Sequence, residues 1–519
     1  MNRSLITSLF LVLITAAGFA NAQTPLATSA TGQEVQLSLR DAILLALENN
    51  LEIEIARAAP AIAFEDLREA KGAYDPILEA SWGRRNASTP IASPFQNAID
   101  PTNQITERGN EYTAGATGRI PLGLSYRSAF SVGRIETNSA FAQLSPQSTG
   151  TWINELRIPL LEGLYRNDTD VRVIRQGLAR DVSIEDFRRE VSDEIQAVER
   201  SYWELRAARE GLTVAQKSVA TARKLREQTE VQYEVGVVSR VAVTQAISGE
   251  AQRDAALIIA RNREENAHDN LLNRTLAPNA AGYVETQITL DNPEFLEYKL
   301  DLQQAVDRAL QFRPELLSAK KRVEDSEVQL SLARNKLLPR LDVVGRYDRA
   351  SLTGRPETGT FGDTARSASA DLVSKAGETT WAVTAEVEFP LFNQQARAAA
   401  SRQEIAYRRT LAEFRRTEQS VVLETRTAAR ALQSAVDGIA AQERAKDAAA
   451  EALRAEQERL RVGDSTPFQV LEFEEDFAEA ENGLIEAFQV YRNAITALER
   501  AQGSLLEARE ISLYDELER

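Results

Sequence analysis

The stretch LSLRDAILLAL at residues 37–47 decides the fold, because it returns as LDLQQAVDRAL at residues 300–310. The match continues for about forty residues at the same spacing of 263. A second pair of blocks recurs 227 residues apart and includes Gly236 and Gly463. Two different spacings mean that the first copy has the longer middle section. The sequence therefore predicts a tandem duplication.

Each copy begins with a helical pattern that ends at a proline. The first helix is predicted over residues 39–74, before Pro76, and its counterpart over residues 302–338, before Pro339. Pro314 is expected in a first turn or at a kink of the second of these helices.

After each of these prolines the apolar residues alternate with polar ones, as they do in strands. In residues 381–389 the odd positions are apolar, whereas Thr384, Glu386 and Glu388 occupy even positions. Similar alternation predicts three further strands, at residues 78–83, 152–158 and 341–348. Segments of about ten residues with aromatic ends are typical of membrane barrel strands, although alone they also fit a soluble sheet.

One more segment of the first copy has a strand pattern. Residues 112–133 are predicted to form an additional hairpin that turns near Pro121. The sequence leaves open whether this hairpin lengthens a barrel wall or lies outside it.

Two very long helices follow the strand regions. Residues from about 168 to 233 and from 396 to 462 contain no proline, and each run would be about 100 Å long at about 1.5 Å per residue. Ile195, Val198 and Tyr202 follow the spacing of a coiled-coil seam. The short breaks at Gly236 and Gly463 predict that each long helix turns back as an antiparallel hairpin.

The N-terminus has the layout of a secretory signal peptide. Arg3 precedes an apolar run at residues 5–14, and Ala20-Asn21-Ala22 forms a cleavage site before Gln23. The run is shorter than the roughly 20 residues of a membrane anchor. No later stretch is apolar for 18 residues, so a membrane-embedded form would have to use strands.

Composition argues against several classes of protein. The chain has no cysteine and a net charge of −16, which disfavours a disulfide scaffold and nucleic acid as a partner. Its one histidine, His268, lies in the Glu-x-x-His spacing of di-iron bundles, but such sites need two of these motifs. With no nucleotide-binding glycine loop either, we expect no catalytic residues, no metal and no cofactor.

The predicted parts constrain one another. Four strands cannot close a barrel, because the smallest membrane barrels have about eight. Two copies of the chain would supply 8 strands and three copies 12, with the long helices bundled around the same axis. A barrel continued by a helical tube of about 100 Å forms a conduit.

This combination resembles the TolC-like outer-membrane efflux factors over nearly the whole mature chain. The resemblance rests on the repeated opening helix, on Pro159-Leu160 and Pro390-Leu391 after the strands, on Tyr202-Trp203-x-Leu205, and on the two glycine turns. It implies a mainly α fold with a β-barrel element: a homotrimer with a 12-stranded barrel in outer-membrane lipid, continued by an α-helical barrel in the periplasm. It also implies a periplasmic adaptor (membrane fusion) protein and an inner-membrane pump as partners.

The resemblance further implies sites at the periplasmic end. The family places acidic residues six and nine positions beyond the second glycine, where this chain has Gln469 and Glu472, with Glu475 close by. Three copies of Glu472 around a narrow axis would favour cations, although a solvated helix face is the simpler alternative. The turns resemble adaptor-docking tips, although a plain hairpin turn is the alternative; their residues are Gly236, Val237, Ser239, Gly463, Ser465 and Thr466.

The expected organisation is a signal peptide at 1–22, a first repeat at 23–277, a linker at 278–299 and a second repeat at 300–519. Strand regions are expected at about 77–159 and 340–390, and helical hairpins at about 168–277 and 396–505. The predicted function is the outer-membrane exit duct of a tripartite efflux or type I secretion system. The cargo stays open between drugs, metals and secreted proteins, and the alternative is a structural coiled-coil envelope protein without transport activity.

Overall fold

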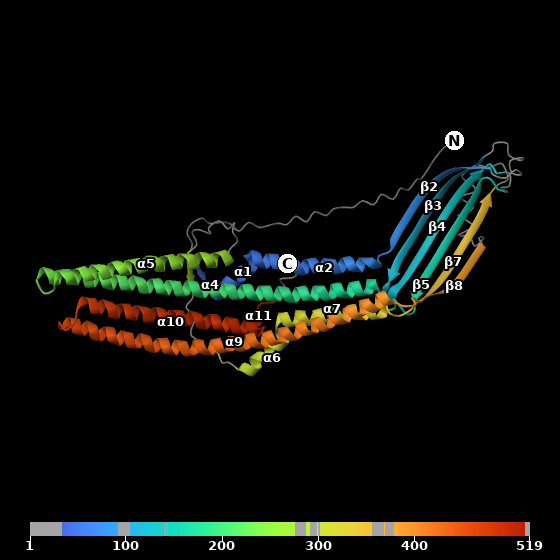
Figure 1. Cartoon of the computed structure of the whole chain (residues 1–519). Helices are drawn as coiled ribbons and strands as arrows, with labels where there is room; N and C mark the ends of the chain where they lie inside the picture. The colour runs from blue at the N-terminus through green and yellow to red at the C-terminus, as the bar shows by residue number, and fades with distance from the viewer. Residues whose placement is uncertain are drawn as a thin grey trace, which may run out of the picture.

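The computed structural model describes residues 34–91, 104–139, 144–275, 287–290, 301–354 and 378–513, together with residues 142, 298 and 368. A β-sheet lies at one end of a set of long, roughly parallel helices (Figure 1). Among the described helices, none is long and apolar enough to cross a bilayer.

The opening helix of the first copy is broken in two. Helix α1 (Leu39–Asn49) ends at Asn50, and α2 (Leu51–Lys71) runs on to a 3-10 turn, η1 (Gly72–Tyr74). The prediction of one continuous helix is therefore wrong here. The Asn50 side chain accepts hydrogen bonds from the first backbone N–H groups of α2, so it caps the new helix.

The second copy is broken at the corresponding place. Helix α6 (Leu302–Phe312) ends at Arg313, and α7 (Pro314–Asn335) begins with Pro314 at its first position. The predicted first-turn place of Pro314 is confirmed, because this position needs no backbone N–H. Proline also pushes the preceding residue out of the helical region, which explains the break.

The two breaks make the same contact. Asn50 donates to the carbonyl of Arg274 at 3.1 Å, and Arg313 donates to the carbonyl of Ala501 at 3.2 Å. The donors are 263 residues apart and the acceptors 227 residues apart, which are the two spacings of the sequence repeat. Short parallel strands β1 (Glu34–Leu37) and β6 (Gln287–Leu290) pair with each other.

The sheet has six antiparallel strands in the order β2-β3-β4-β5-β7-β8. Their bounds are β2 (Ile77–Pro90), β3 (Gln104–Ile120), β4 (Leu124–Thr137), β5 (Gln147–Pro159), β7 (Arg340–Gly354) and β8 (Glu378–Glu388). The four predicted strands are therefore joined in one sheet by two more. The additional hairpin is β3 and β4, which pair in the middle of the sheet and turn through η2 (Pro121–Gly123). The 12-stranded trimer, with four strands from each chain, stays a prediction.

The long helices form two hairpins. Helix α4 (Asp168–Glu234) turns into α5 (Arg240–Thr275), and α9 (Gln394–Arg461) turns into α10 (Pro467–Ala501). Helices α4 and α9 have 67 and 68 residues, so each is about 100 Å long. The predicted helical hairpins are confirmed.

The predicted seam of α4 is buried. Ile195, Val198, Tyr202 and Leu205 are at most 1% exposed and pack against α1, α5 and the short helix α11 (Leu505–Ala508). The Tyr202 hydroxyl donates to the Leu37 carbonyl at 3.4 Å. This cluster holds the opening helix of the first copy against the middle of the long hairpin.

Candidate functional site

The two hairpin turns lie together at the end of the molecule opposite the sheet (Figure 1). Gly236 has φ +77° and Gly463 has φ +84°, a conformation that favours glycine. The next residue closes each turn with the same bond: Val237 donates to Gln232 at 2.8 Å, and Asp464 donates to Arg459 at 2.9 Å. A Cβ atom at either glycine would meet nothing within 4 Å, so the backbone conformation alone requires glycine.

The surfaces of the two turns differ. Around the first turn, the side chains of Val235 and Val237 are 70% and 72% exposed. The second turn also exposes a valine, Val462 (69%), but it has Asp464 where the first turn has Val237. Its Ser465 hydroxyl hydrogen-bonds to Glu456 of α9. Of the predicted tip residues, Ser239 immediately precedes α5. The structure therefore brings the predicted tip residues of both turns to one end of the molecule.

Gln469 takes part in the start of α10. Thr466 and Gln469 form a capping box, in which each side chain accepts a hydrogen bond from the backbone N–H of the other at 3.4 Å. This geometry is a common way to satisfy the free N–H groups of a helix start. Gln469 stands where the resemblance leads us to expect an acidic residue, and it caps α10.

Glu472 and Glu475 follow Gln469 at intervals of three residues along α10, and both are exposed. Glu475 accepts a hydrogen bond from the Arg253 guanidinium at 3.3 Å. The structure thus aligns the three gate candidates on neighbouring turns of one helix, and it ties the last of them to α5.

Sequence reasoning missed Arg253, which joins the two hairpins. Its side chain is 8% exposed, and its Nη2 also donates to the backbone carbonyl of Leu471 at 2.6 Å. A buried guanidinium needs such acceptors, because an unpaired buried charge is costly. The duplication held a signal for it: the position 227 residues later is Ala480, so the charge is specific to one copy.

Glu474 is a second functional candidate that sequence reasoning left aside. Its carboxyl is 7% exposed on the side of α10 that packs toward the first hairpin. Burial raises the pKa of this carboxyl, while a hydrogen bond with Thr221 and the charge of Arg253 act in the opposite direction. The corresponding residue of the first copy is Ile247, so an acid here again marks a difference between the copies.

A cavity of about 710 Å³ lies beside these residues, between the two hairpins. Arg253 is the basic residue of its lining, whereas four lining residues are acidic: Glu475, Asp476, Glu479 and Glu486. This end of the molecule therefore has a negative interior between its hairpins, next to the buried link from α5 to α10.

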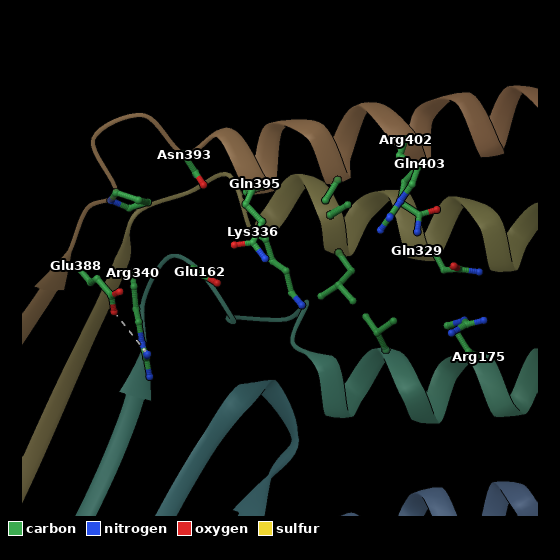
Figure 2. Close-up of a pocket in the computed structure, with 16 residues that line it drawn as sticks. Glu162, Arg175, Gln329, Lys336, Arg340, Glu388, Asn393, Gln395, Arg402 and Gln403 are labelled. Carbon is green, nitrogen blue, oxygen red and sulfur yellow. Dashed lines mark ion pairs between the residues drawn. The ribbon is translucent and has the colours of Figure 1, made fainter.

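A second cavity, of about 590 Å³, lies where the helices meet the sheet (Figure 2). Arg340 and Glu388, at the helix-side ends of β7 and β8, form an ion pair at 3.8 Å. Lys336 reaches Asp168 at the start of α4 at 2.7 Å. Burial raises the pKa of the Glu162 carboxyl at the same junction. These contacts hold the strands to the helices at a polar joint.

No group of three or more histidine, cysteine or acidic side chains in the described ranges is placed to hold a metal ion. His268 lies on α5, and its Nδ1 is 3.6 Å from a carboxylate oxygen of its chain neighbour Asp269. The Glu-x-x-His spacing noted in the sequence is thus not part of a metal-binding cluster in the described structure.

In the described residues the fold is a six-stranded antiparallel sheet joined to helical hairpins about 100 Å long. Residues 305–504 match the family model of the outer membrane efflux protein. The resemblance inferred from the sequence is therefore confirmed over most of the second repeat.

Solved structures extend the likeness to the first repeat. The CmeC outer membrane channel of Campylobacter jejuni has a TM-score of 0.64 at 16% identity, over 90% of this chain and 86% of that chain. VceC of Vibrio cholerae has a TM-score of 0.62 at 16% identity, over 90% and 96%. The MtrE outer membrane channel of Neisseria gonorrhoeae has a TM-score of 0.60 at 17% identity, over 90% and 89%. No curated protein sequence matches this chain significantly.

Proposed function

We propose that this chain is the outer-membrane exit duct of a tripartite efflux or type I secretion system. The observation that carries the proposal is the two-sided character of the sheet. The register places apolar and aromatic side chains on one face and polar side chains on the other, in neighbouring strands. For example, Trp82 lies opposite Tyr112, and Tyr347 opposite Trp381, on the apolar face.

The apolar face suits lipid and the polar face suits a water-filled lumen. Ser128 and Asn154, two polar residues of the apolar face, hydrogen-bond to each other at 2.8 Å, which lowers the cost of placing them against lipid. On the polar face Arg157 pairs with Asp342 and with Glu386, each at 2.7 Å. The sheet then lies in the outer membrane, and the helices extend into the periplasm.

The working assembly is a homotrimer whose sheets close one barrel, continued by an α-helical barrel. A single sheet cannot shut a pore, because neither edge strand has a second partner in the described ranges. The family match and the shared fold of known channels support this assembly, together with a periplasmic adaptor protein and an inner-membrane pump as partners. Residues 1–22 act as the export signal, and the repeats at 23–277 and 300–519 flank the linker at 278–299.

The far end of the helices acts as the gate and as the docking surface. Glu472 forms an acidic ring in the trimer, next to the capping residue Gln469 and to Glu475, which is linked to Arg253. The adaptor contacts the turns, at Gly236, Val237 and Ser239 and at Gly463, Ser465 and Thr466. The exposed valines of the first turn support an apolar contact there.

The test is recovery and conductance of the full chain. We expect the protein in the outer-membrane fraction, as a trimer that resists dissociation on a gel without heating, and ion-conducting channels after reconstitution in planar bilayers. A coiled-coil envelope protein without transport activity would give no conductance. That result, or recovery as a water-soluble monomer, would overturn the proposal.

A further inference from the structure

Both edges of the sheet lack a partner strand among the described residues. Within this part of the chain β2 and β8 each pair on one side only, and every residue of β8 is exposed. In β2, thirteen of the fourteen positions are exposed. Free backbone N–H and C=O groups are not tolerated against hydrocarbon, so both edges require a strand as partner.

We propose that each chain contributes all six strands to the barrel wall, so that three chains close an 18-stranded barrel by pairing β8 of one chain with β2 of the next. The inference rests on the proposed trimeric channel and states what closes it. Its partner is a second copy of this chain at each edge.

The hairpin of β3 and β4 continues the pattern of its neighbours. On the apolar face Tyr112 of β3 lies between Trp82 of β2 and Val132 of β4, and Phe130 lies opposite Trp152 of β5. An apolar, partly aromatic face in register across six strands is what a barrel wall in lipid needs.

The opposite face is equally continuous. Thr113 of β3 lies opposite Ser131 of β4, which lies opposite Thr151 of β5. The Ser131 and Thr151 hydroxyls are 3.2 Å apart and hydrogen-bonded. A hairpin outside a four-stranded wall would not line the lumen, so its polar residues would not need to share a face with those of the wall strands.

The hydrogen-bonded ladders are also complete. Strand β2 pairs with β3 from Ile77 to Pro90, which is its whole length. Strand β4 pairs with β5 from Ser125 to Ile135. A wall without the hairpin would have to break both ladders and pair β2 directly with β5.

Strand direction fits closure. Six alternating strands make β2 and β8 run in opposite directions, so β8 of one chain meets β2 of the next antiparallel, like every other pair in the sheet. Both edges carry exposed aromatic residues of the apolar face: Trp82 is 64% exposed and Trp381 76%. Edge pairing would make the apolar face continuous around the barrel.

The consequence is a wide outer exit. At equal strand tilt the diameter of a barrel grows roughly in proportion to strand number, so 18 strands give about 1.5 times the diameter of 12. The narrowest point of the duct would then lie at the helical end and not in the membrane.

The chain has no cysteine, so engineered disulfides can be read without background. Ala80→Cys on β2 is combined in turn with Val383→Cys, Ala385→Cys or Val387→Cys on β8, all four on the apolar face. After mild oxidation of outer-membrane fractions, we expect at least one combination to give covalent trimers on a reducing-agent-free denaturing gel. The matched control, Ser81→Cys with Ala385→Cys, places the thiols on opposite faces and should give fewer covalent trimers.

A second set of variants tests the four-stranded wall. Ala80→Cys combined with Asn154→Cys or Leu156→Cys on β5 should give no disulfide within one chain, because two strands separate β2 from β5. Such a disulfide would overturn the inference. Electron microscopy of the unmodified trimer gives an independent reading: 18 strands support the inference, and 12 strands overturn it. A conducting trimer with 12 strands would leave the proposed function intact, whereas a non-conducting soluble protein would overturn that as well.

Discussion

Replacing Arg253 by alanine should loosen the gate end. The buried guanidinium donates to the Leu471 carbonyl at 2.6 Å and to the exposed Glu475 carboxylate at 3.3 Å. A hydrogen bond from a charged donor contributes about 2 kcal/mol, and this corresponds to about a 30-fold shift in an equilibrium. We count only the Leu471 bond, because solvent weakens the contact with an exposed carboxylate.

The chain offers a matched control on the same pair of helices. Arg263 of α5 also reaches α10, where it pairs with Glu486 at 3.5 Å, but both side chains are more than half exposed. An exposed pair of this kind contributes about 0.5 kcal/mol or less, so Arg263→Ala should shift the same equilibrium by only about twofold.

The assay is single-channel recording of the purified trimers in planar bilayers. We expect Arg253→Ala to raise the fraction of time in high-conductance states well above that of Arg263→Ala. Hydrogen exchange at the start of α10 should rise in the same order. Equal behaviour of the two variants would refute the role of the buried link, whatever the absolute conductance.

Three further changes test the gate end. Glu472→Ala should raise conductance at low divalent-cation concentration or reduce cation preference, because it removes an acidic ring; unchanged currents and selectivity would count against Glu472 as the constriction. Burial raises the pKa of Glu474 above its usual value of 4.5, so the folded state binds its proton more tightly and stability falls as pH rises from 4.5 through the folded-state pKa. Glu474→Gln should therefore raise the melting temperature at pH 7 but not at pH 4, and a parallel shift at both would contradict this reasoning. Gly463→Ala should cost about 1 kcal/mol, since φ is +84° and no atom blocks the new methyl group; a melting temperature equal to that of the unmodified protein would show that the turn relaxes.

The helical part of the fold could be predicted because its signals are local and repeated. Runs without proline, a regular apolar seam and two isolated glycines are enough to define hairpins of this length. The break at Asn50 was not predicted. Asparagine ends one helix and caps the next through side-chain hydrogen bonds to backbone N–H groups, and the sequence alone does not show whether those bonds form.

The sheet was only partly predictable. Strands of the second copy alternate cleanly, whereas β3 and β4 contain many glycine, serine and alanine residues whose facing is ambiguous in sequence. Their place in the wall depends on pairing with β2 and β5, which lie outside the hairpin itself. Strand order is a long-range property, and a single strand pattern does not contain it.

The candidate site divides in the same way. The turns and the α10 acids were predicted through the family resemblance, which places them by their distance along the sequence from a glycine. Arg253 and Glu474 matter because α5 packs against α10, and this contact joins segments more than 200 residues apart. Comparing the two copies position by position would have pointed to both residues, since each replaces an apolar counterpart.

The tight turn between β3 and β4 also limits how such proteins can diversify. Since β2 must leave the helices and β5 must return to them, an insertion between these strands has to be an even number of strands. The smallest step is one hairpin, and a three-fold assembly multiplies it by three. Among related proteins the barrel would therefore change in steps of six strands, while the helical hairpins stay the same.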